Sequence, residues 1–129
     1  MARTDYTAKV TATNKELTAR EKIALKDFES CAKLNDIIKG EPLTLSIANV
    51  VKVEVHNEHS KQNIDYNVFI VVTSDGKKYR TGSESFYESY CDIIDELNDA
   101  GEDTSAVDFK LYKVQSNNFD GDFIKCALA

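Results

Sequence analysis

The spacing of apolar residues changes along the chain, and this change limits the folds available to it. From Thr18 to about Ala32 apolar residues recur at helical spacing, and Thr18 with Glu21 has capping-box spacing. The helix can continue irregularly to 40–42, where a glycine and a proline end it. From residue 51 to 55 valines alternate with polar residues, the period of a half-buried strand. Both periods together predict a fold of mixed helices and strands.

Further strands and a second helix follow from the same patterns. The expected strands are 51–55, 66–73, 77–80, 107–114 and 123–128. A tight turn at 74–76 joins the second strand to the third. Apolar residues at helical spacing predict a helix over 84–98, capped by Ser83 or Ser85 and ending near Gly101.

The order of elements predicts an α+β domain. A mostly antiparallel, five-stranded curled sheet or an OB-like, partly open barrel suits an N-terminal helix and a helix between strands three and four. A flat antiparallel sheet backed by both helices is the alternative. We expect residues 1–17 to form an arm or edge strand and residues 18–129 a single domain.

Several classes of protein are not favoured by the sequence. No apolar run approaches the ~18 residues of a membrane span, and the N-terminus lacks the apolar stretch of a signal peptide. Three widely spaced cysteines, Cys31, Cys91 and Cys126, indicate reduced thiols rather than a disulfide framework. We therefore expect a cytoplasmic protein without membrane association.

No pattern of catalytic residues is present. The two histidines, His56 and His59, lie in a polar segment, and the chain has no phosphate-binding glycine loop and no HExxH. Four acidic residues of the second helix have the spacing of one helical face and can be read as metal ligands: Asp92, Asp95, Glu96 and Asp99. A solvated helix face explains them better. We expect no enzyme activity, no metal and no cofactor.

Charge is segregated along the chain. Residues 81–109 contain nine acidic side chains and no lysine or arginine. The whole chain has 22 acidic and 16 basic residues, so the rest carries 13 acidic and 16 basic residues, a net charge of +3. An acidic protein can therefore present a mildly basic surface elsewhere.

Alternation in the strands predicts an aromatic and basic sheet face. If Phe109 and Ile124 point into the core, their sequence neighbours point outward. The candidate nucleic-acid-binding residues are Tyr66, Lys77, Lys78, Tyr79, Arg80, Lys110, Tyr112, Phe123 and Lys125. Aromatic rings interleaved with cations bind single strands by stacking and phosphate neutralisation. The alternative is that these rings pack in the core and the lysines keep a strand edge soluble.

Four short segments resemble small single-stranded-DNA-binding proteins of phages and prophages of Gram-positive bacteria. They are the strand-to-helix junction at 77–86, the acidic segment at 92–96, the closing hairpin at 116–126 and residues 55–58. The resemblance covers roughly residues 50–128. It implies an OB-like fold and sequence-independent single-stranded DNA binding in phage replication or recombination, inside the bacterial host cell. Replication or recombination proteins and a second copy of the chain are then expected partners.

Two departures from that family keep another class of function open. Asn117 and Asp122 stand where the resemblance leads us to expect lysines, which weakens the basic face. The alternative is an acidic phage inhibitor that imitates DNA and binds a host nuclease or defence enzyme. Its partner-binding residues would be Glu88, Asp92, Asp95, Glu96 and Asp99. A purely structural interaction module is a third class. The sequence leaves the choice between DNA and RNA open.

Overall fold

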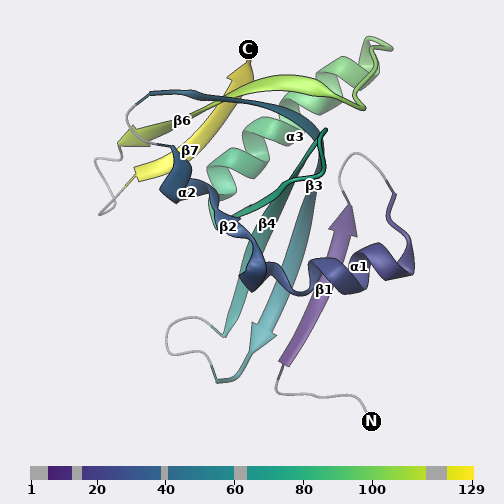
Figure 1. The fold of residues 1–129 in the computed structure, drawn as a ribbon, viewed down its shortest axis with the longest axis vertical. Coiled ribbons are helices and arrows are strands. Elements are labelled where there is room, and N and C mark those ends of the chain that lie inside the picture. Colours follow the sequence, from purple (N-terminus) through teal and green to yellow (C-terminus); the bar gives the residue numbers. More distant parts are fainter. Residues whose placement is uncertain (1–5, 13–15, 39–40, 60–63, 116–121) are drawn as a thin grey trace.

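The chain folds into one curled sheet with helices on both faces (Figure 1). The computed structural model describes residues 6–12, 16–38, 41–59, 64–115 and 122–129. The strands are β1 (Tyr6–Ala12), β2 (Ala32–Lys33), β3 (Leu43–Asn57), β4 (Asp65–Thr73), β5 (Lys78–Thr81), β6 (Val107–Gln115) and β7 (Asp122–Leu128). The helices are α1 (Ala19–Leu25), α2 (Leu34–Ile37) and α3 (Glu84–Asp99), and a 3₁₀ turn, η1, spans Phe28–Ser30.

The long strand β3 gives the sheet its shape. The sheet runs in the order β2-β5-β4-β3-β6-β7, and β1 also pairs with β3. The first part of β3 pairs with β6, whereas the later part pairs with β4 on one side and β1 on the other. A shift in register between Ile47 and Asn49 bends the strand between these two parts. The bend curls the sheet into an open half-barrel (Figure 1).

Two apolar clusters stabilise the two faces of the sheet. The larger cluster lies between α3 and the sheet and includes Phe69, Phe86, Tyr90 and Phe109. The smaller cluster lies on the opposite face, under α1 and η1. It consists of Leu25, Phe28, Val51, Val53, Val55, Val68 and Ile70, and Ala8 and Val10 of β1 pack against it. The sheet is therefore covered on both faces over β3 and β4.

Much of the predicted architecture is confirmed. The α+β class, the curled sheet, the three-strand meander, the helix between β5 and β6 and the two final strands are all present. The tight turn is present too, with Gly76 at a positive φ of 89° and the Gly76 N–H donating to the Thr73 carbonyl. The strand count was wrong: the sheet has seven strands, and β2 pairs in parallel with β5. Residues 6–12 form a strand along β3.

The predicted helix over 18–32 was too long. Its capping box between Thr18 and Glu21 is confirmed, but α1 ends at Leu25, and Gly40, the expected stop, lies outside the described residues. Ile23, one of the apolar residues at helical spacing that predicted this helix, is 68% exposed rather than buried. The helix ends because Asp27 leaves helical geometry and the Ser30 hydroxyl donates to the Asp27 carbonyl, which favours a turn. None of the described helices is long and apolar enough to cross a membrane.

Candidate nucleic-acid interface

The β6–β7 hairpin has one buried face and one face turned away from α3. Phe109, Leu111, Ile124 and Cys126 are buried in the cluster under α3. The alternate residues point to the other side of the sheet, as the sequence predicted. Leu128 is the exception: alternation along β7 places it on the same face as Ile124 and Cys126, but it is 51% exposed at the end of the strand.

Four of the predicted binding residues share this second face. Lys110, Tyr112, Phe123 and Lys125 form what we call the outer face of the hairpin. Tyr112 lies directly opposite Lys125 across the strand pair, and the Lys125 Nζ is 5.9 Å from the centre of the Phe123 ring. Both lysines are exposed and both rings are half-buried. Two rings beside two cations are the combination that stacks bases and neutralises phosphates.

Two serines, one at the N-cap of α3 and one within it, hold the hairpin's position relative to the helix. The Ser83 hydroxyl caps α3 by accepting from the Phe86 N–H, and it also donates to the Ile124 carbonyl at 3.1 Å and accepts from the Ile124 N–H at 3.2 Å. The Ser89 hydroxyl accepts from the Cys126 N–H at 3.2 Å. These bonds satisfy backbone groups along β7 and place α3 on the side opposite the outer face.

Of the nine acidic residues in 81–109, six lie on α3, two follow it, and Asp108 lies on β6 on the same side of the sheet as Lys110. All nine acidic side chains of residues 81–109 are exposed, which agrees with a solvated helix face. Within the described parts of the chain, the ion pairs involve Lys52 and His56 with carboxylates of β3, β4 and the turn after β3, and no carboxylate of α3. Tyr87 of α3 stacks on Phe69 at 4.5 Å, with the Lys52 Nζ 5.9 Å from the Tyr87 ring centre. The rest of α3 remains strongly negative.

The candidates outside the hairpin are not gathered on the outer face. We expected Tyr79 beside Lys78 and Arg80, but Tyr79 packs against the cluster under α3, while its two neighbours alternate to the other face. The Arg80 Nε donates to the Cys31 carbonyl at 3.1 Å. Tyr66 packs half-buried against the smaller cluster. Since β3 and β4 separate β5 from β6, the single continuous face that we expected is not formed.

One open hollow lies between the first part of β3 and the β4–β5 turn. It has a volume of about 290 Å³ and is lined by Lys77 and Tyr79 together with Thr44 and Ser46 of β3. Thr44 lies directly opposite Lys110 in the β3–β6 pair. Lys77, in the turn before β5, is therefore near the part of β3 that pairs with the hairpin. Asn117 lies outside the described residues, and the side chain of Asp122 is not described.

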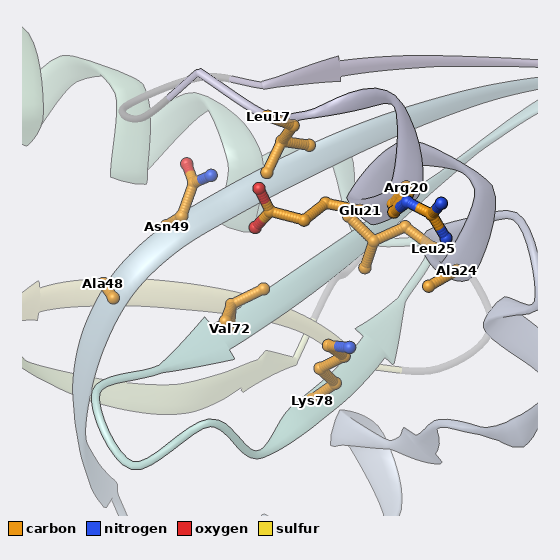
Figure 2. A pocket seen from close by; sticks show the side chains of 9 residues that line it. All are labelled: Leu17, Arg20, Glu21, Ala24, Leu25, Ala48, Asn49, Val72 and Lys78. Atoms are coloured by element: carbon orange, nitrogen blue, oxygen red, sulfur yellow. The ribbon is translucent and has the colours of Figure 1, made fainter.

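A second hollow lies beneath α1 (Figure 2). Its volume is also about 290 Å³, and most of its exposed lining is apolar. The lining residues are Leu17, Arg20, Glu21, Ala24, Leu25, Ala48, Asn49, Val72 and Lys78. Of these, only Lys78 was predicted from the sequence as a binding residue. The available signal was Asn49, a polar residue inside an otherwise apolar strand segment, which is buried with 3% of its surface exposed.

The described residues offer little for redox or metal chemistry. The three cysteines are free thiols, and burial raises the pKa of Cys126 to about 11 and also raises the pKa of Cys31 and Cys91. Such thiols are poor nucleophiles at neutral pH. Over the part of the chain that the structure describes, no group of three or more histidine, cysteine or acidic side chains is arranged to hold a metal ion.

Comparison with protein-family models, with curated proteins and with solved structures finds no match to this chain.

Proposed function

We propose that this protein binds single-stranded DNA without sequence preference, on the outer face of the β6–β7 hairpin. The observation that carries the proposal is the arrangement of Tyr112, Phe123, Lys110 and Lys125 on the side of the sheet opposite α3. Within this one hairpin, the two aromatic rings stack on bases and the two lysines contact the phosphates of the DNA backbone. The resemblance to phage single-stranded-DNA-binding proteins adds a role in phage replication or recombination.

The energetics of this face suit weak but sequence-tolerant contacts. Stacking of a base on an aromatic side chain contributes ~1–3 kcal/mol, so two rings supply a useful part of the affinity. Each lysine that neutralises a phosphate releases a counterion, so affinity falls as salt rises. The curled, open sheet supports the proposal, since OB-like barrels bind single strands on such a surface.

The decisive experiment is fluorescence anisotropy with a labelled oligothymidylate of about thirty nucleotides, at low and moderate salt, with a duplex of equal length as control. We expect salt-sensitive binding of the single strand and weaker binding of the duplex. Absence of binding to either at low salt would remove the proposal.

Substitutions then locate the interface. Tyr112→Ala combined with Phe123→Ala should weaken binding by at least tenfold, because two stacking contacts are lost. Tyr112→Phe keeps the ring and should bind as the wild type does. Leu128→Ala is the matched control, an exposed apolar residue of the same strand whose alternation places it with the other face. Equal losses in the control and the double variant would show that the effect is structural.

The acidic surface of α3 favours a second candidate, an inhibitor that imitates DNA. Five of the six carboxylates of α3 are the predicted partner-binding residues, and they are exposed along one helix, so they present a row of negative charge. The residues are Glu88, Asp92, Asp95, Glu96 and Asp99. This candidate predicts no DNA binding and inhibition of a DNA-handling enzyme that is lost when all five are changed to their amides. The outer face supports the first candidate directly, and α3 is compatible with both.

A further inference from the structure

We infer that the hollow beneath α1 holds one nucleotide of the bound strand, with the base between apolar side chains and its phosphate on Arg20 and Lys78. The inference rests on the proposed function and extends it to a second site on the same side of the sheet. It also assigns a role in binding to α1, for which the sequence predicted none.

The hollow and the outer face of the hairpin lie on the same side of the sheet. Along β3, Ile47 and Val50 belong to the cluster under α3. Thr44 and Ser46 alternate to the other side, where Thr44 is opposite Lys110. Asn49, after the register shift, is opposite Val72 and lines the hollow with it. A DNA strand that leaves the outer face of the hairpin and crosses β3 therefore reaches the hollow without passing around an edge of the sheet.

The size and walls of the hollow suit a single planar group. Leu17, Ala24, Leu25 and Val72 supply apolar walls from α1, the segment before it, and β4. A volume of about 290 Å³ is at the lower limit of the ~300–1,000 Å³ of ordinary ligand pockets. A base has an apolar face and is small enough for this space, whereas a folded peptide element is too large.

The charges around the hollow favour a phosphate near one part of its rim. Arg20 and Lys78 are exposed, and Figure 2 shows them away from the Glu21 carboxylate. That carboxylate accepts a hydrogen bond from the Thr18 N–H at 3.1 Å, which holds it at the end of the hollow near Leu17. The negative charge is thus kept apart from the two cations, and an anion can approach them.

The surface between the two sites is polar and carries one further lysine. The hydroxyls of Ser46 and Ser74 are hydrogen-bonded to each other at 2.6 Å, which ties the β4–β5 turn to β3. Lys77 lies next to this contact in the open hollow that Thr44 also lines. Two carboxylates oppose an anion on this route: Asp108, opposite Ser46, and Asp75, which lines the same hollow as Lys77. A DNA backbone that crosses this surface contacts Lys110 first, then Lys77, and finally Lys78 at the hollow beneath α1.

The test compares a variant that fills the hollow with a neighbour that does not. Ala24→Trp places a large side chain in the hollow, whereas Ile23→Trp puts the same side chain on the 68% exposed position beside it. With a labelled oligothymidylate of about thirty nucleotides, Ala24→Trp should weaken binding about tenfold, the loss of one stacked base, and Ile23→Trp should not.

A second pair of variants tests the same site without depending on correct folding of the Ala24→Trp protein. Arg20→Gln with Lys78→Gln should weaken binding and reduce the salt dependence, whereas Lys22→Gln, on the same helix but outside the hollow, should leave binding almost unchanged. In ¹H–¹⁵N spectra of the wild type, oligothymidylate should shift the amides of Asn49 and Val72 as well as those of the hairpin.

The outcomes separate the two proposals. If Tyr112→Ala with Phe123→Ala weakens binding, but filling the hollow and neutralising its cations do not, the hollow is not a nucleotide site and the proposed function stands. If the wild type binds no oligothymidylate, both proposals fail. If the amides of Asn49 and Val72 shift with protein concentration alone, a second copy occupies the hollow and the inference is overturned.

Discussion

Tyr90 is a polar residue in an apolar position. Its ring is fully buried in the cluster under α3, 5.3 Å from the ring of Phe109 and 6.3 Å from that of Phe86. Among the described residues, its hydroxyl has no hydrogen-bond partner. Burial raises the pKa of Tyr90 well above its ordinary value, since ionisation in this environment is unfavourable.

We predict that Tyr90→Phe stabilises the protein. A buried hydroxyl without a partner costs ~1–3 kcal/mol of desolvation, so its removal should raise the free energy of unfolding by about 1 kcal/mol. Urea denaturation followed by circular dichroism measures the change. Tyr87→Phe is the control, because the Tyr87 hydroxyl is hydrogen-bonded to Cys91 and its loss should not stabilise. A less stable Tyr90→Phe protein would show that the hydroxyl is satisfied in solution.

His56 pairs with a carboxylate at the loop end of the β3–β4 hairpin. Its Nδ1 is 2.7 Å from a carboxylate oxygen of Asp65, the residue opposite it in the strand pair, and its Nε2 is 3.9 Å from Glu58. The hydrogen bond to Asp65 is the main cause of a raised pKa of His56. The imidazolium form is therefore favoured in the folded protein.

The sign of this linkage gives a second prediction. Because the folded pKa of His56 is above the unfolded value of about 6.5, its contribution to stability is fully present below that pH and is lost as pH rises through the folded pKa. The difference in unfolding free energy between wild type and His56→Gln should thus shrink from pH 5.5 to about 8. In an Asp65→Asn background the same comparison should be nearly independent of pH. A difference that grows with pH would contradict the assignment.

At the scale of elements, α3 and β7 are joined by side-chain hydrogen bonds to backbone. Ser83 and Ser89 bind the backbone of Ile124 and Cys126, so the junction and the closing hairpin that carried the family resemblance meet in space. Both segments therefore have a structural role. A sheet edge that a helix satisfies in this way is protected from pairing with other chains.

We predict that Ser89→Ala destabilises the protein by about 1–2 kcal/mol, since the Cys126 N–H then loses its partner. Thermal unfolding followed by calorimetry measures this loss of stability. Ser85→Ala, one turn earlier on α3, is the matched control, because in the described structure its side chain makes no hydrogen bond to β7. Unchanged stability of Ser89→Ala would mean that water replaces the hydroxyl.

Local patterns predicted the elements whose pairing partners are close in sequence. The β4–β5 turn, α3 and the alternation of β6 and β7 follow from a few neighbouring residues each. The extent of β3 from Leu43 and the pairing of β2 with β5 depend on distant partners, which a pattern does not contain. The early end of α1 comes from the local turn after it, which helical spacing alone does not reveal.

The candidate site was predictable to the same extent. The alternation of side chains within one hairpin correctly predicted a shared face for four residues: Lys110, Tyr112, Phe123 and Lys125. The position of Tyr79 depends on which face of β5 meets α3, so alternation alone left it open. The hollow beneath α1 brings together residues from three parts of the chain, and only buried Asn49 gave any sign of it.

On the scale of the whole molecule, charge along the sequence becomes charge on opposite sides of the sheet. The carboxylates of α3 are exposed on the helix, and the lysines of the outer face point away from it. A helix is ~10–12 Å across, so the two sets of charges are separated by at least about that distance. At 0.15 M salt the Debye length is about 8 Å, and at 0.01 M it is about 30 Å. Repulsion between α3 and a bound strand is therefore screened at physiological salt and felt at low salt.

This separation predicts how the acidic helix affects DNA binding. The variant changes five carboxylates to amides: Glu88→Gln, Asp92→Asn, Asp95→Asn, Glu96→Gln and Asp99→Asn. It should bind oligothymidylate several-fold more tightly than the wild type at 0.01 M salt and equally at 0.15 M, because only long-range repulsion has been removed. Asp108→Asn, opposite Ser46 on the route between the two sites, should increase affinity at both salt concentrations. Weaker binding by the five-residue variant would instead place α3 in the interface and contradict the separation of the two surfaces.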